Sequence, residues 1–126
     1  MKFMESLLYT ILVVDDDPVI REVVAFNLRI RGYRVYSVSN GFDALEATAE
    51  LSPDLVVLDV MMPDLDGWEV CKIIKDNDES IKVLMLTARD TERDKMIGRA
   101  IMRADAYITK PFDIDELLVA VEQLIG

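Results

Sequence analysis

The sequence predicts a single-domain, doubly wound α/β fold, in which one parallel sheet of five strands is covered on both faces by five helices. Five short apolar runs alternate with five segments of helical periodicity, and the connections are only a few residues long. The apolar runs are uninterrupted, which is typical of parallel strands buried on both faces. With 126 residues, the chain is long enough for one domain with a core and too short for two ordinary ones.

The first strand and helix follow the N-terminal segment. Leu12–Val14 is the predicted strand, Asp17 suits the N-cap of the next helix, and Pro18 suits its first position. We expect the helix to end near Gly32, a suitable C-cap. Its inward stripe consists of Ile20, Val24 and Leu28. A second apolar row, here named the outer row, consists of Val19, Val23, Phe26 and Ile30.

The middle of the chain carries two further strand and helix pairs. Residues 35–38 form the second predicted strand, and a helix follows it from Asn40. Leu55–Asp59 is the third strand, and its terminal carboxylate lies where the strand leaves the core. Asp66, with Glu69 three residues later, is a capping signature for the helix after that strand.

The last third of the chain completes the alternation. Residues 83–86 form a fourth buried strand, and residues 91–101 have helical periodicity. Residues 106–109 form a short fifth strand. Asp113 and Glu116 are then predicted to cap the last helix.

Composition excludes several classes of protein. The net charge of −10 argues against a nucleic-acid surface, because DNA binding needs cations that neutralise phosphates, and it favours basic protein patches as partners. The chain has no histidine for a metal site, and its single cysteine, Cys71, cannot form an internal disulfide, which suits a reducing compartment. The apolar run Leu7–Val14 is too short to span a bilayer and ends in three aspartates. We therefore expect a cytoplasmic protein that binds neither nucleic acid nor membrane.

Polar residues at the carboxyl ends of the strands are expected to meet at one edge of the sheet. This edge would hold Asp15, Asp16, Asp59, Thr87 and Lys110. Three carboxylates within about 5 Å repel by roughly 3 kcal/mol per pair at an effective dielectric constant near 20, so the cluster needs a cation or a proton. Oxygen ligands alone suit Mg²⁺, with Mn²⁺ as the alternative. Each residue also has an ordinary structural interpretation, and it is their joint placement that favours a functional site.

Four motifs, which lie in order along essentially the whole chain, make it resemble a response-regulator receiver domain of two-component phosphorelays. They are Ile11–Asp17, Asp59–Gly67, Leu86–Ala88 and Tyr107–Phe112. The resemblance implies a flavodoxin-like sheet in the order 2-1-3-4-5 and a signalling domain rather than an enzyme. It also implies that Asp59 accepts a phosphoryl group from the phosphohistidine of a histidine kinase or a phosphotransfer protein. One receiver domain would span residues 1–126, with about 9–125 structured and no effector domain in this chain.

The resemblance also assigns roles by motif position. The implied Mg²⁺ ligands are the carboxylates of Asp16 and Asp59 and the carbonyl of Met61, with Asp15 acting mostly through water. Thr87 and Lys110 would hold the phosphoryl group, and Thr87 with Tyr107 would form the conformational switch. The Lys110-Pro111 peptide bond is expected to be cis.

Further roles concern regulation and partners. Met61 and Arg89 occupy the positions that tune hydrolysis of the acyl phosphate, and we expect them to hinder water and make dephosphorylation slow. The outer row lies where kinases dock on such domains, with burial under neighbouring loops as the alternative. The fourth helix, fifth strand and fifth helix would form the face that binds a downstream effector. The last helix has no Lys or Arg, so we expect a monomer or a weak phosphorylation-dependent dimer rather than an ionic dimer.

The chain departs from the family pattern before the fifth strand. Arg103-Ala104 stands where the family usually has Gly-Ala, and the segment from Thr87 to Lys110 is about one residue longer than usual. Without this glycine, no residue is well suited to the left-handed C-cap, so the sequence does not define where the fourth helix ends.

Three other classes compete with this interpretation. A haloacid-dehalogenase-like phosphatase would use Asp15 as nucleophile, but Pro18 starts a helix where that fold needs extra segments. A flavodoxin would need a phosphate-binding loop after the first strand, where three aspartates would repel a phosphate. A receiver-like scaffold that takes no phosphate is disfavoured by the complete acidic set.

Overall fold

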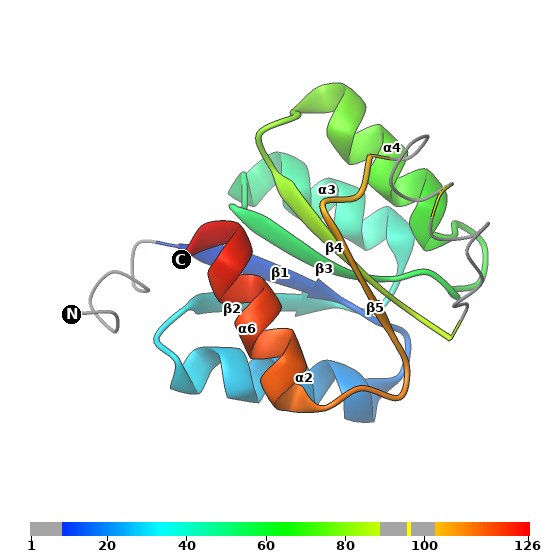
Figure 1. The fold of residues 1–126 in the computed structure, drawn as a ribbon. Coiled ribbons are helices and arrows are strands. Elements are labelled where there is room, and N and C mark those ends of the chain that lie inside the picture. The colour runs from blue at the N-terminus through cyan, green and yellow to red at the C-terminus, as the bar shows by residue number, and fades with distance from the viewer. Residues whose placement is uncertain (1–8, 89–95, 97–102) are drawn as a thin grey trace.

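The computed structural model describes residues 9–88, 96 and 103–126 (Figure 1). The strands are β1 (Thr10–Val14), β2 (Arg34–Val38), β3 (Leu55–Asp59), β4 (Lys82–Thr87) and β5 (Ala106–Thr109). The helices are α2 (Pro18–Ile30), α3 (Gly41–Leu51), α4 (Gly67–Asn77) and α6 (Ile114–Ile125). The five strands agree with the predicted ones to within two residues at each end.

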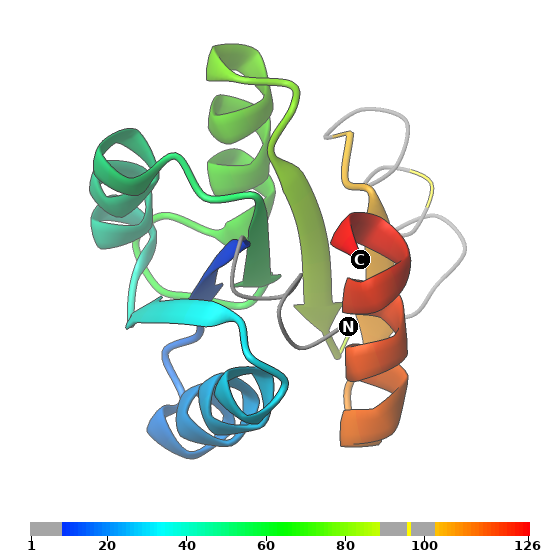
Figure 2. The same cartoon turned by 90° about the vertical axis from the view of Figure 1, so that its left-hand side faces the viewer.

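The five strands form one parallel sheet in the order β2-β1-β3-β4-β5, as the family resemblance implied. Helices α2 and α6 cover one face, and α3 and α4 cover the other (Figures 1 and 2). The described residues contain four helices, not the five predicted. The remaining predicted helix, at residues 91–101, lies outside the described residues except for Met96. None of the described helices is long and apolar enough to span a membrane.

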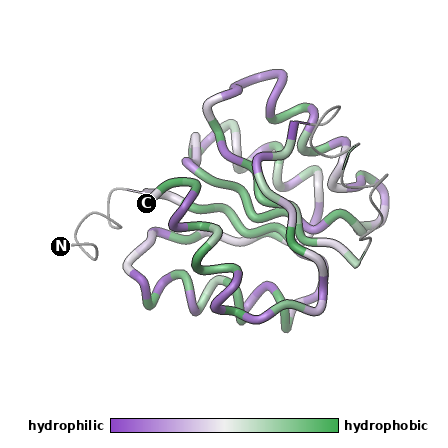
Figure 3. The backbone as a smooth tube through the Cα atoms, viewed as in Figure 1, coloured by the Kyte–Doolittle hydropathy of each residue, from purple (hydrophilic) through white to green (hydrophobic). Residues whose placement is uncertain are grey.

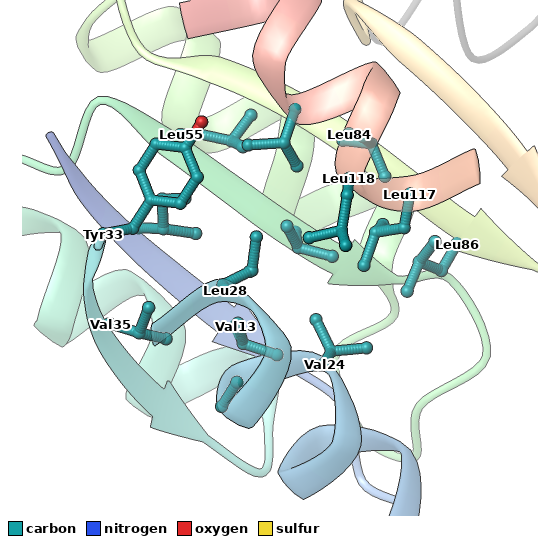
Figure 4. Close-up of a cluster of buried hydrophobic side chains, with 14 of the residues drawn as sticks. Val13, Val24, Leu28, Tyr33, Val35, Leu55, Leu84, Leu86, Leu117 and Leu118 are labelled. Atoms are coloured by element: carbon teal, nitrogen blue, oxygen red, sulfur yellow. The ribbon is translucent and has the colours of Figure 1, made fainter. Parts of the chain in front are cut away.

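The three central strands, β1, β3 and β4, are largely apolar (Figure 3). The sheet separates two hydrophobic clusters. Alternate residues of each strand point to opposite faces, so Val13 and Leu84 join the cluster under α2 and α6 (Figure 4). Their neighbours Leu12 and Met85 join the cluster under α3 and α4. Because both faces are buried, the backbone is fixed up to the last residue of each central strand, and the polar groups that follow start from rigid positions.

The predicted starts of the four described helices are confirmed in position, and the predicted capping differs at one of them. The side chains of Asp17, Asn40 and Asp66 accept hydrogen bonds from backbone N–H groups in the first turns of α2, α3 and α4. Asp113 is the N-cap residue of α6, but its exposed side chain makes no capping hydrogen bond, so the capping signature predicted there is wrong in that respect.

Arg103 takes the left-handed conformation that the missing glycine would have supplied, with φ of 62°. Its guanidinium pairs with the carboxylates of Asp76 and Glu79 at the end of α4. Next to it, the buried ammonium of Lys75 lies 2.6 Å from the carboxylate of Asp105. These ion pairs fix the approach to β5, so the chain enters the edge strand in register despite the departure from the family pattern.

Candidate functional site

Three carboxylates meet at the carboxyl edge of the sheet. Asp15 follows β1 and Asp59 ends β3, and the two residues are only 1% and 3% exposed. Asp16 is exposed. One carboxylate oxygen from each of the three lies within 4.8 Å of the others. A cavity of about 470 Å³ opens over them. The predicted convergence of these residues is therefore observed.

Lys110 bridges the two buried carboxylates. Its ammonium nitrogen, Nζ, lies 3.0 Å from Asp15 Oδ2 and 3.2 Å from Asp59 Oδ1. Burial lowers the pKa of Lys110, but the hydrogen bonds and negative charges of the two aspartates outweigh it and raise that pKa above its usual value. Lys110 is thus a fixed positive charge beside Asp59. The peptide bond to Pro111 is cis, as expected.

The Asp59 carboxyl group retains a proton more readily than an ordinary aspartate. Burial, and next the charge of Asp15, raise its pKa from 3.8 to about 6, against the opposing effects of Lys110 and of a hydrogen bond from the Met61 N–H. The single positive charge of Lys110 therefore does not neutralise the negative charge of the three carboxylates. Oxygen donors beside an open cavity, with no nitrogen or sulfur donor among them, fit a hard divalent cation such as Mg²⁺.

The loop after Asp59 is held against the strand end by Gly67. The Gly67 N–H donates to the carbonyl of Val60 at 3.0 Å. A Cβ atom added to Gly67 would lie 2.2 Å from the carbonyl oxygen of Asp59. Sequence reasoning placed Gly67 only within a motif and missed this contact, although a glycine directly after a helix N-cap was the available signal. The Met61 side chain, 51% exposed, lines the cavity.

Thr87 and Tyr107 lie on the same face of adjacent strands. Thr87, fully buried at the end of β4, pairs with Thr109 of β5, and Tyr107 lies two residues before Thr109. The Tyr107 ring stacks on that of Trp68, with centroids 6.0 Å apart. Trp68 was not singled out from the sequence. Arg89, the second predicted hydrolysis-tuning residue, lies outside the described residues.

The outer row of α2 is exposed along its whole length. Its four side chains are between 48% and 69% exposed, which contradicts simple burial under neighbouring loops. A largely apolar cavity of about 510 Å³ lies beside its first half and is closed on the other side by residues 110–112 and Ile114. The row thus reaches the acidic edge, since Lys110 lines both cavities.

Arg21, which the sequence did not mark, also contacts this edge. From the second turn of α2, its guanidinium Nη1 donates to the main-chain carbonyl of Asp15 at 2.9 Å. An arginine in an amphipathic helix carries no sequence signal for such a contact.

The chain is similar to known proteins over most of its length. A model of the response regulator receiver domain matches residues 11–122, which include all four motifs. Chemotaxis protein CheY4 of Vibrio cholerae is 30% identical, with a TM-score of 0.87 over 92% of this chain and 98% of that one. Response regulator TrrA of Thermotoga maritima, solved in complex with Mg²⁺ and BeF, is 37% identical, with a TM-score of 0.83 over 92% and 98% of the two chains. The BeF3-activated receiver domain of DrrB, also from Thermotoga maritima, is 36% identical, with a TM-score of 0.85 over 92% and 96%.

Proposed function

The chain belongs to the response regulator receiver domain family, and on that premise we propose that Asp59 accepts a phosphoryl group from the phosphohistidine of a sensor histidine kinase or phosphotransfer protein. Receiver domains are phosphoacceptor signalling modules, and they interact with histidine kinases. The observation that carries the proposal is the placement of Lys110 between Asp15 and Asp59 at the floor of an open acidic cavity.

In the proposed step, a carboxylate oxygen of Asp59 attacks phosphorus in line with the leaving imidazole nitrogen. A P–O bond forms as the P–N bond breaks, and the electron pair of the broken bond stays on the imidazole. Lys110, already hydrogen-bonded to Asp59, is placed to stabilise the negative charge on the phosphoryl oxygens. Thr87, at the end of the next strand, would supply a hydroxyl to the same oxygens.

We propose that Mg²⁺ would be held by the carboxylates of Asp16 and Asp59 and the carbonyl of Met61, with Asp15 acting mostly through water. When bound, Mg²⁺ would supply positive charge to the acidic cluster and to the phosphoryl oxygens. Mn²⁺ has the same preference for oxygen ligands and is the expected substitute.

The phosphorylated form is proposed to be long-lived. The Met61 side chain lines the mouth of the cavity, where an apolar group hinders the approach of water. Arg89 is proposed to act with it. A dephosphorylation half-time as short as that of the fastest receivers would contradict this proposal, and Met61→Asn should shorten the half-time.

The kinase or phosphotransfer protein is proposed to dock on the outer row. The row is apolar and exposed, and the adjoining cavity leads to Lys110. A helix lying on α2 would therefore bring its phosphohistidine to the acidic edge. Phe26→Ser, far along α2 from the site, should slow transfer from a cognate kinase and leave labelling by a small phosphodonor unchanged.

The output face is proposed to consist of the predicted helix at residues 91–101, which lies outside the described residues except for Met96, together with β5 and α6. A groove of about 600 Å³ between β5 and α6 is bordered by Asp105, Asp115 and Glu116, with Val119 54% exposed at its wall. Such a face favours a downstream effector with a basic and partly apolar segment rather than a second copy of α6, which carries no Lys or Arg. Movement of Thr87 and Tyr107 on phosphorylation would alter this face.

The proposal is tested by Mg²⁺-dependent labelling with acetyl phosphate. The native protein should take up one phosphoryl group when Mg²⁺ is present and none when it is chelated. Asp59→Asn should abolish the labelling. Equal labelling of the native and variant proteins would refute the proposed acceptor.

A further inference from the structure

Asp16 differs from the other two carboxylates of the site in how it is oriented. The carboxylates of Asp15 and Asp59 are each held by Lys110 and by a backbone N–H. In the part of the chain that the structure describes, no side-chain hydrogen bond orients Asp16, which is exposed. Its direction therefore depends on the two peptide groups that flank it.

Both flanking peptides are held, and by different residues. On one side, the Asp17 N–H donates to Asp15 Oδ1 at 2.9 Å. On the other side, Arg21 Nη1 donates at 2.9 Å to the carbonyl of Asp15, which belongs to the peptide group joining Asp15 to Asp16. Removing Arg21 would free this second peptide and leave the first one fixed.

We propose that Arg21 is a positioning residue for the cation site, because its hydrogen bond to the Asp15 carbonyl fixes the peptide from which the Asp16 carboxylate extends. This inference rests on the proposed Mg²⁺-binding function. Residues that hydrogen-bond to metal ligands and orient them typically raise metal affinity about 10- to 100-fold.

The charge of Arg21 and its proposed positioning role predict opposite changes in Mg²⁺ affinity when the residue is replaced. Arg21 is a cation near an acidic cluster, so its charge alone weakens Mg²⁺ binding, and removing that charge should strengthen binding. Loss of positioning should weaken binding instead. The sign of the change therefore separates the two effects.

Arg29 provides a matched control in the same helix. Its guanidinium Nη2 donates to the main-chain carbonyl of Val35 at 3.0 Å, which is the same kind of bond. That bond lies near the start of β2, toward the amino ends of the strands, whereas the acidic site lies at their carboxyl ends. Arg29→Met removes the same charge and the same kind of hydrogen bond without touching the site.

The experiment is calorimetric titration of MgCl₂ into the native protein and into Arg21→Met, Arg21→Lys and Arg29→Met. We expect Mg²⁺ affinity to fall about 10- to 100-fold in Arg21→Met and by a smaller factor in Arg21→Lys. It should stay unchanged in Arg29→Met. Thermal unfolding without Mg²⁺ should show similar losses of stability in Arg21→Met and Arg29→Met.

Unchanged or tighter Mg²⁺ binding by Arg21→Met would overturn the inference. If that variant fails to fold, Arg21→Lys decides, because native-like affinity in it would also overturn the inference. Absence of Mg²⁺ binding by the native protein would contradict the proposed function itself, whereas native binding with no effect at Arg21 would contradict only the role given to this residue.

Discussion

Asp59 is the residue whose chemistry is most altered by its surroundings. Burial, with the charge of Asp15, raises its pKa from 3.8 to about 6, although Lys110 lies 3.2 Å away. Without a divalent cation, the ionised form is therefore unfavourable in the folded protein. The energy corresponding to this difference in pKa is roughly 3 kcal/mol at most. The folded protein is thus less stable with Asp59 ionised, but this arrangement leaves the carboxylate accessible to a cation and a phosphoryl group.

The first prediction concerns stability as a function of pH. Because the pKa of Asp59 is higher in the folded state, folding is stabilised while Asp59 is protonated, and this contribution is lost as pH rises from about 4 to about 6. Asp59→Asn removes the ionisation. Urea unfolding without Mg²⁺ should show the variant to be more stable than the native protein by on the order of 1–3 kcal/mol at about pH 7 and by less at about pH 4. A constant difference across this range would contradict the raised pKa.

The second prediction concerns Lys110. Its ammonium lies 3.2 Å from Asp59, so Lys110→Met should slow labelling by acetyl phosphate about 100-fold. Mg²⁺ should still bind, because the carboxylate ligands remain and a competing cation has gone. Lys72→Met is the control, since Lys72 forms only an exposed pair with Asp76. Equal labelling rates in the two variants would show that Lys110 has no role in the proposed phosphoryl transfer.

At the scale of elements, the short connection from β3 to α4 shapes the site. Gly67, at the start of α4, allows the loop to close onto the carbonyl of Asp59. The close approach leaves no room for a Cβ atom, so the geometry of the loop and of the phosphoacceptor are linked.

The third prediction therefore concerns Gly67→Ala. The added Cβ would lie 2.2 to 2.9 Å from backbone atoms of Asp59 and Val60. A side-chain rotation cannot relieve these contacts, so the loop must shift. We expect a loss of about 1–3 kcal/mol in unfolding free energy and a marked loss of labelling. Gly41→Ala, whose Cβ would meet Leu65 and Val70 at 2.8 Å, should cost stability with a smaller effect on labelling. The reverse order would contradict a role for Gly67 in shaping the site.

The fourth prediction concerns the approach to β5. Arg103 is in the left-handed region, which costs a non-glycine residue about 1–2 kcal/mol, while its exposed ion pairs contribute roughly 0–1 kcal/mol. Arg103→Ala keeps the strain and loses the pairs. Arg103→Gly loses both. Chemical denaturation should therefore show the glycine variant to be more stable than the alanine variant by about 1 kcal/mol. Equal stability would mean that this backbone conformation is not retained.

Local patterns predicted the elements well because most signals were strong and short-range. Buried apolar runs gave the strands, and Asp17, Asn40 and Asp66 cap their helices as expected. The prediction failed in detail at Asp113, because a capping pattern does not reveal whether the side chain turns toward the helix or toward solvent. The left-handed Arg103 was not foreseen either, because its stabilising partners lie on α4, far away in sequence.

At the scale of the whole molecule, the parallel sheet produces the site. Strands β1, β3, β4 and β5 run in the same direction, so residues separated by up to 95 positions meet at one edge. This convergence could be predicted from the parallel arrangement of the strands, which placed Asp15, Asp59 and Lys110 at the same end of the sheet. Supporting contacts could not be predicted in this way. The Arg21 hydrogen bond and the stacking of Tyr107 on Trp68 depend on side-chain directions that the topology does not specify.

The fold also explains why the site and the proposed partner faces are separate. The cavity beside the outer row of α2 and the groove between β5 and α6 share no lining residue. Lys110 of the acidic edge lines the first, and Tyr107 lines the second. The kinase and the downstream effector would therefore bind different surfaces in the proposed function.

The central claim is that Asp59, and no other carboxylate of the cluster, becomes phosphorylated. The most direct measurement is borohydride reduction after labelling with acetyl phosphate and Mg²⁺, followed by peptide mass spectrometry, because reduction of an aspartyl phosphate leaves homoserine at the modified position. The account predicts homoserine at Asp59 alone, and none when Mg²⁺ is chelated. Homoserine at Asp15 or Asp16, or reduction products independent of Mg²⁺, would contradict it.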